Sequence, residues 1–168
     1  MSSKTEQACR DFLQRRRTLV LSTLSQDGTV DNGAVPFVWA SESELVILVS
    51  ELAAHTSNLL NLLAQPNSKA TVSGLLLADE SETEELFARE RLSLSLSVAE
   101  VARPGEEADR LFTLFSKQFG EVIKVLQTLP DFHLFKLKVE KGRYVHGFGA
   151  AYEFSESPCC ELSRVKGA

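Results

Sequence analysis

Residues 91–101, RLSLSLSVAEV, limit the possible folds because their side chains alternate strictly in polarity. Leu92, Leu94, Leu96 and Val98 alternate with three serines. A two-residue period places all four apolar side chains on one face of a β-strand. The segment therefore predicts a strand with one face in the core and a small, polar opposite face.

Other segments also favour strands, because apolar or β-branched residues run between turn-forming residues. Pro36 has no N–H to donate, so its strand should lie at a sheet edge or carry a bulge. The tripeptide EKG at 140–142 predicts a turn between the last two strands, and a change of phase predicts a bulge near Leu134. The additional predicted strands are residues 18–24, 30–40, 45–50, 69–78, 131–139 and 143–149.

Helical periodicity occurs in four segments. The first is 4–17, where Arg15–Arg17 would complement the helix dipole at its C-terminal end. The second segment ends before Pro66, and the third and fourth cover residues 104–119 and 122–129. Their apolar faces are Leu59, Leu62 and Leu63; Ala108, Leu111, Phe112, Phe115 and Phe119; and Val122, Val125, Leu126 and Leu129.

About seven strands and three or four helices, without a regular βαβ order, favour one fold class. It is a mainly β (α+β) fold, a mostly antiparallel sheet or barrel with peripheral helices. The 168 residues, 43% of them hydrophobic, suit a single domain over residues 1–168. We expect an N-terminal helix within 1–17 and a C-terminal tail at 155–168.

Charge and cysteine content narrow the function classes. A net charge of −5 argues against general nucleic-acid binding, and no apolar run is long enough to span a membrane. The N-terminus lacks the apolar core of a secretory leader, so we expect a cytoplasmic protein. Cys9, Cys159 and Cys160 form no metal-binding spacing, and their odd number predicts reduced thiols and no metal site.

A polar cluster lies where the apolar strand ending at Ser50 gives way to the helix containing Leu59. Backbone N–H groups at a helix start bind anions. Side chains of Ser50, His55, Thr56 and Asn58 could add donors for a phosphate group. The simpler interpretation is that Thr56 or Ser57 caps the helix while His55 and Asn58 face water. Both interpretations remain open on the residues alone.

Arg89 and Arg91 form a second candidate site in the segment FARERL. One strand period separates them, so they should point the same way and present two guanidinium groups to a phosphate or carboxylate. Alternatively, they pair with acidic residues of the preceding loop, 79–85. His133 and His146 are better explained as structural histidines. No nucleophile or acid–base motif is present, so catalytic residues cannot be named.

Several segments together resemble one family: LSTLSQDGTVDNGAVPFV, LVSELAAHTSNLL, FARERLSL, DFHLFKL and GRYVHGFGAAY. In this order they are similar to the pyridoxamine 5'-phosphate oxidase-like split-barrel superfamily, and particularly to its haem-utilisation branch. The resemblance covers residues 12–154. It implies a six-stranded split β-barrel, a homodimer, and flavin mononucleotide (FMN) bound at the dimer interface.

The resemblance also implies roles for residues. The flavin phosphate would be held by Ser50, His55, Thr56 and Asn58. Arg89 and Arg91 would lie beside the groove. The resemblance therefore favours phosphate binding by the residue 50–58 cluster over helix capping. The implied function is a flavin-dependent oxidoreductase acting on a small molecule, with the redox chemistry supplied by the cofactor.

One departure from the family supports an alternative assignment. Haem-binding members use a C-terminal histidine as iron ligand, but the tail SESPCCELSRVKGA has none. The alternative function is therefore a haem-binding protein in which His133 or His146 replaces that ligand, and Cys159 or Cys160 is a weaker thiolate candidate. A ligand-free structural dimer is a third possibility.

Overall fold

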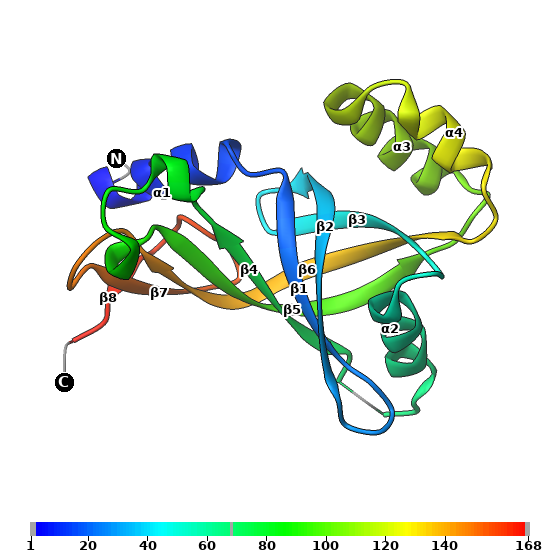
Figure 1. The fold of residues 1–168 in the computed structure, drawn as a ribbon, viewed down its shortest axis with the longest axis horizontal. Helices are drawn as coiled ribbons and strands as arrows, with labels where there is room; N and C mark the ends of the chain where they lie inside the picture. Colours follow the sequence, from blue (N-terminus) through cyan, green and yellow to red (C-terminus); the bar gives the residue numbers. More distant parts are fainter. Residues whose placement is uncertain (1–2, 68, 167–168) are drawn as a thin grey trace.

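The computed structural model describes residues 3–67 and 69–166 and contains a closed antiparallel β-barrel (Figure 1). Six strands are paired in the order β3-β2-β1-β4-β5-β6, and β3 pairs with β6 to close the ring. Two further strands, β7 and β8, continue the sheet beyond β6. The predicted six-stranded barrel with peripheral helices is confirmed. Its strands are β1 Thr18–Leu24, β2 Val30–Ser41, β3 Glu44–Ser50, β4 Thr71–Leu77, β5 Arg91–Val101, β6 Phe132–Val145, β7 Ala151–Ser155 and β8 Ser163–Arg164.

The alternation in β5 is confirmed, because its four apolar side chains lie in the barrel core. The predicted turn at 140–142 is wrong, since β6 runs through it as one 14-residue strand. Ser95 pairs with Lys141 and Leu96 with Val139, so Glu140 is the extra residue of a bulge. Pairing with β5 on one side and β7 on the other keeps this segment extended.

The bulge predicted near Leu134 is also absent from the described strand. Leu134 and Phe135 are both fully buried, although they point to opposite faces. Phe135 belongs to the barrel core, whereas Leu134 belongs to a second core cluster that includes Leu111 and Phe115. Two buried faces, rather than an irregular strand, explain the change of apolar phase.

Pro36 lies where β2 changes partners. It is paired with Thr18 at the end of the β1 ladder, and the β3 ladder begins at Phe37. The predicted edge strand is therefore wrong, because β2 has neighbours on both sides. The irregularity in β2 falls later, between Trp39 and Ser41.

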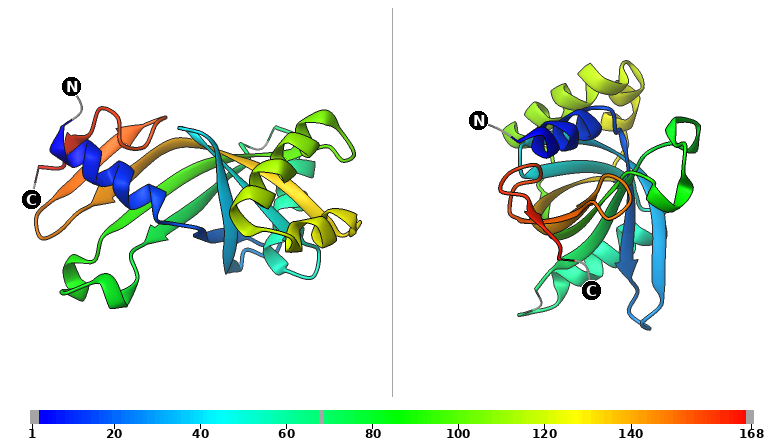
Figure 2. Two further views of the ribbon diagram at one scale, coloured as in Figure 1. Left: turned by 90° about the horizontal axis from the view of Figure 1, so that it is seen from above. Right: turned by 90° about the vertical axis from the view of Figure 1, so that its left-hand side faces the viewer.

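The four helices of the described chain lie at the periphery of the barrel (Figure 2). Helices α3 and α4 lie at one end of the molecule, and α1 lies at the other. Ile123 is the buried residue of α4, and Leu126 packs against the second core cluster. Val122 and Val125 are exposed, so the apolar face predicted for this helix is wrong for the two valines. The structure contains no helix, among the residues it describes, with the length and apolarity to cross a bilayer. The helices are α1 Lys4–Gln14, α2 Ala54–Ala64, α3 Glu106–Phe119 and α4 Val122–Thr128, with short 3-10 helices η1 Glu80–Glu82 and η2 Leu86–Ala88.

Candidate functional site

The predicted polar cluster lies at the junction between β3 and α2. The Ser50 hydroxyl donates to Asp131 Oδ2 over 3.0 Å and accepts a hydrogen bond from the Leu52 N–H. Ala53 is the N-cap of α2, and its side chain provides no capping bond. The cap predicted from Thr56 or Ser57 is therefore wrong, because the helix begins earlier, at Ala54.

Thr56 and Asn58 point into the fold. The Thr56 hydroxyl is fully buried and donates to the Ser50 carbonyl over 2.6 Å. The Asn58 amide donates to Thr23 Oγ1 at 3.0 Å and to Asp31 Oδ2 at 2.8 Å. These bonds fix α2 against the barrel, so both side chains have structural roles in this chain. Their predicted role in holding a flavin phosphate stays a prediction.

The surroundings of this cluster are acidic. Asp31 and Asp131 accept hydrogen bonds from its members, and Glu51 follows Ser50 in the chain. Partial burial lowers the pKa of His55, and the nearby Asp31 carboxylate offsets only part of that effect. A neutral His55 cannot contribute positive charge near pH 7. A phosphate here would therefore need cations from elsewhere.

The two arginines do not form the predicted fork. Arg89 follows η2 and precedes β5, so the expectation that one strand carries both arginines is wrong. Arg89 donates to the Ala78 carbonyl and pairs with Glu80 at 3.4 Å. Arg91 donates to the Arg89 carbonyl over 2.9 Å. For Arg89, the alternative of pairing with the acidic loop is confirmed.

Strand β6 separates the two predicted groups. Ser50 is paired with Phe132 at the start of β6, and Arg91 is paired with Val145 at its end. The thirteen steps from Phe132 to Val145, at about 3.3 Å each, give roughly 40 Å along the sheet. One chain therefore does not bring Arg89 and Arg91 to the 50–58 cluster. A shared site would require a second copy, as the predicted dimer supposes.

His133 lies at the start of β6 and has both ring nitrogens occupied. Nδ1 is 2.7 Å from Glu100 Oε1, and Nε2 is 2.7 Å from Glu51 Oε1. Burial taken alone would lower the pKa of His133, but the bonds to Glu100 and Glu51 outweigh it and raise that pKa above its ordinary value. His133 of β6 therefore contacts β5 through Glu100 and the residue after β3 through Glu51, and it has no nitrogen left for a metal.

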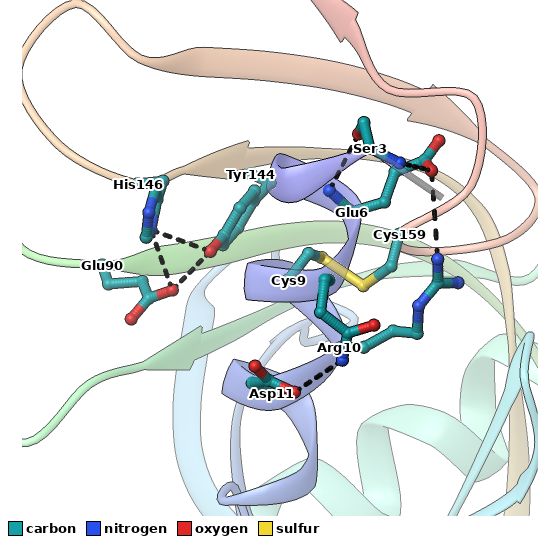
Figure 3. Close-up of a disulfide and its surroundings, with 10 residues drawn as sticks. Ser3, Glu6, Cys9, Arg10, Asp11, Glu90, Tyr144, His146 and Cys159 are labelled. Atoms are coloured by element: carbon teal, nitrogen blue, oxygen red, sulfur yellow. Dashed lines mark hydrogen bonds and ion pairs between the residues drawn. A yellow bond between two sulfur atoms is a disulfide. The ribbon is translucent and has the colours of Figure 1, made fainter. Parts of the chain in front are cut away.

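A second histidine group lies at the other end of β6 (Figure 3). The buried Tyr144 hydroxyl donates to Glu90 Oε1. His146 Nδ1 lies 3.0 Å from the Tyr144 oxygen and 3.3 Å from Glu90 Oε1. The two rings are stacked with centroids 5.6 Å apart. Burial, followed by the contact with Glu90, raises the pKa of Tyr144 well above its ordinary value, so the hydroxyl keeps its proton.

Exposed apolar side chains surround this end. Phe87 in η2 and Phe148 between β6 and β7 are 89% and 74% exposed, and Leu86 is also exposed. Figure 1 shows the loop that carries η1 and η2 at the same end of the molecule as the turn that joins β6 to β7. A pocket of about 360 Å³ lies between Arg15, the acidic loop and Glu90. Exposed apolar residues that lie together can mark a surface for a ligand or partner, whereas single exposed ones are normal.

Helix α1 covers the same end and is held there covalently. Cys9 and Cys159 form a disulfide between α1 and the C-terminal tail, and both are buried (Figure 3). The prediction of reduced thiols is therefore wrong for these two residues, while Cys160 stays free. Their separation of 150 residues explains why no cysteine spacing indicated the bond.

The three arginines at the end of α1 differ in their roles. Helix α1 ends at Gln14, and Arg15 is its C-cap residue. Arg16 is buried, donates to the Leu77 carbonyl and pairs with Glu82 at 2.9 Å. The dipole interpretation is therefore wrong for Arg16, which instead fixes the acidic loop to α1.

The sequence indicated a structural role for His146 but did not identify Glu90. No local signal could have found it, because Glu90 and Tyr144 are 54 residues apart. Only the pairing of β5 with β6 brings the residue before β5 next to the end of β6.

Comparison with known proteins gives a consistent result. The family model for pyridoxamine 5'-phosphate oxidase matches residues 5–146. The heme oxygenase HutZ of Vibrio cholerae serotype O1 is 35% identical over 155 residues, which are 92% of this chain and 84% of HutZ.

Two solved structures are also similar. The structure of HutZ, a heme storage protein from Vibrio cholerae, has a TM-score of 0.71 at 33% identity. The match covers 83% of this chain and 92% of the HutZ chain. ChuZ from Campylobacter jejuni has a TM-score of 0.82 at 30% identity, over 96% of this chain. The present chain spans 62% of the ChuZ length.

Proposed function

The chain belongs to the pyridoxamine 5'-phosphate oxidase family, and on that premise we propose that it binds haem and serves in haem utilisation. The observation that carries this proposal is its relationship to HutZ, a protein named for haem, over 92% of the chain. The same comparison favours haem, the alternative from the sequence, over a flavin-dependent oxidoreductase.

The residues present fit this group. Haem needs an apolar surface for the porphyrin and a side chain that can ligate iron. Phe148 is an exposed aromatic side chain two residues after His146, which is itself partly exposed, and Phe87 is exposed three residues before Glu90. Bound haem would supply redox chemistry that the protein's side chains cannot perform. The chain itself would hold the porphyrin and present the ligand.

FMN remains the second candidate ligand, because the family match is to a flavin enzyme by name. The features of this chain support it less. Thr56 and Asn58 are engaged inside the fold, and carboxylates surround them. A dianionic phosphate is disfavoured beside Asp31 and Asp131 unless a second chain supplies cations.

The homodimer also belongs to the proposal. Exposed Leu52, Val122 and Val125 are apolar side chains that a second copy could cover. Size-exclusion chromatography with light scattering should give twice the chain mass. The cytoplasmic location stays a prediction, and the Cys9–Cys159 bond is a reason to test it, since disulfides persist mainly in oxidising compartments.

Parallel titrations test the proposal. Purified protein is titrated with ferric haem while the Soret band is recorded, and separately with FMN while flavin fluorescence is recorded. We expect a saturable Soret shift with one haem per chain and weaker or no flavin quenching. Saturable FMN binding without a Soret shift would return the assignment to a flavoprotein.

A further inference from the structure

We infer that His146 is the axial ligand of the haem iron, through Nε2, and that Glu90 and Tyr144 position its ring. This inference rests on the proposed haem binding and adds the identity of the ligand. His146 takes the place of the C-terminal histidine ligand that this sequence lacks.

Proton positions around His146 fix which nitrogen is available. The Tyr144 hydroxyl has one proton, which it donates to Glu90. The contact between Tyr144 and His146 Nδ1 must then be donated by the ring, so Nδ1 carries the proton of the neutral imidazole. Nε2 is left with its lone pair. Within the described part of the chain, Nε2 of His146 has no hydrogen-bond partner.

A carboxylate behind a ligating imidazole is a common arrangement in metal sites. It fixes the tautomer and the ring orientation and raises the basicity of the ligating nitrogen. Glu90 lies 3.3 Å from Nδ1 and is itself held by Tyr144. Tyr144 packs its ring against Phe12 of α1, so the whole group rests on the barrel core. Stacking on Tyr144 further restricts the orientation of the His146 ring.

The other histidines do not meet these conditions. Both nitrogens of His133 bind carboxylates. His55 lies at the β3–α2 end, where its Nδ1 would be 2.5 Å from a Cβ added at Gly33, so its ring packs directly on β2. His146 alone among the three histidines combines a carboxylate on one nitrogen, an open second nitrogen and a side chain that is 48% exposed.

The surroundings suit a porphyrin. Phe87 and Phe148 provide exposed aromatic surface for the macrocycle. Arg15, whose side chain is 58% exposed, pairs with Glu90 at 3.8 Å and is the cation we assign to a propionate, in a pocket that also contains Glu82, Glu84 and Glu85. Cys159 is excluded as a thiolate ligand by its disulfide, which leaves Cys160 as the thiol competitor.

The experiment compares haem complexes of the wild-type protein and the variants His146→Ala, His146→Gln, His133→Ala and Cys160→Ser. Electronic absorption, electron paramagnetic resonance and resonance Raman spectra identify the iron ligand directly. We expect both His146 variants to lose the histidine–iron signature and to bind haem more weakly by about tenfold or more. Added imidazole should restore the wild-type spectrum. His133→Ala and Cys160→Ser should leave it unchanged.

Glu90→Gln tests the positioning role. It should keep haem bound but lower the iron–histidine stretching frequency of the ferrous complex, because an amide accepts a weaker hydrogen bond than a carboxylate. An unchanged frequency would overturn the role of Glu90.

The outcomes separate this inference from the proposed function. If wild-type protein binds haem and the two His146 variants keep its spectrum, the ligand assignment is wrong while haem binding stands. Loss of the signature in Cys160→Ser or His133→Ala would likewise overturn it. If wild-type protein gives no Soret shift, haem binding fails and the ligand assignment fails with it. Circular dichroism of each variant confirms that it is folded.

Discussion

Strand β6 has a histidine group at each end, and the two groups differ in their second ring nitrogen. His133 has a carboxylate on both nitrogens, one from β5 and one from the residue after β3. His146 has Tyr144 and Glu90 on Nδ1 only, and its side chain is 48% exposed. The comparison teaches that a His–Glu contact is a structural clamp when both nitrogens are occupied. It prepares a metal ligand when one nitrogen stays open.

The two ends are also fastened differently. A disulfide joins α1 to the tail at the His146 end. At the His133 end, α3 and α4 are held by apolar packing and by ion pairs such as Lys136–Glu107. The largest effects on stability are therefore expected at the His146 end, and the following predictions are ordered by size.

Removing the disulfide should have the largest effect. The double variant Cys9→Ser, Cys159→Ser should lose roughly 4–5 kcal/mol of unfolding free energy, because the bond closes a loop of 150 residues. Urea denaturation with and without reductant measures this loss. Reductant should destabilise the wild-type protein by a similar amount and leave the variant unaffected. A wild-type protein insensitive to reductant would contradict the bond.

Gly142→Ala should follow, with a loss of about 3 kcal/mol through overpacking. A Cβ at Gly142 would lie 2.5 Å from the Ser93 carbonyl oxygen and 2.4 Å from the Phe154 ring, and the backbone oxygen cannot move aside. Gly33→Ala is the matched control near the other end. The three atoms nearest to its Cβ belong to the His55 ring, which can rotate, so the expected loss is below about 1 kcal/mol. Equal losses would show that the two ends tolerate crowding alike.

Tyr144→Phe should cost about 2 kcal/mol, the usual size of a hydrogen bond to a charged group that is partly buried. The change removes the bond to Glu90 and leaves the ring packing on Phe12. Thermal and urea denaturation measure the loss. A variant as stable as the wild-type protein would mean that water replaces the hydroxyl without cost.

His133→Gln should have the smallest effect, about 1 kcal/mol, and only at low pH. The folded-state pKa of His133 is raised, so its stabilising charge is fully present below the unfolded pKa of about 6.5 and is lost as pH rises through the folded value. The gap in stability between wild type and variant should therefore be larger near pH 6 than near pH 9. Urea denaturation at both pH values measures it, and a gap that grows with pH would reverse the argument.

Local patterns were enough to predict most of the barrel. The alternation of Leu92 to Val98 and the apolar run of β3 follow directly from which faces are buried. The turn predicted at 140–142 failed because strand pairing on both sides overrides the local preference of a glycine-containing tripeptide. Val122 and Val125 misled the assignment of the α4 face because apolar residues can also remain exposed.

The candidate site was less predictable than the fold. Ser50, Thr56 and Asn58 carry the right donors for a phosphate, but only the structure reveals that Thr56 and Asn58 use them internally. The Glu90–Tyr144–His146 group depends on contacts between residues far apart in the chain. Sequence periodicity reports which face a residue occupies, and it does not report which distant side chain meets it there.

The Cys9–Cys159 bond has a topological consequence. From Cys9 to Cys159 the peptide backbone and the sulfur bridge form one covalent ring, and the six barrel strands are part of that ring. A single proteolytic cut in the exposed β1–β2 connection, between Leu24 and Val30, would open the ring without dividing the molecule. The nicked protein would migrate as one species on a denaturing gel and separate into two fragments only after a thiol reagent is added.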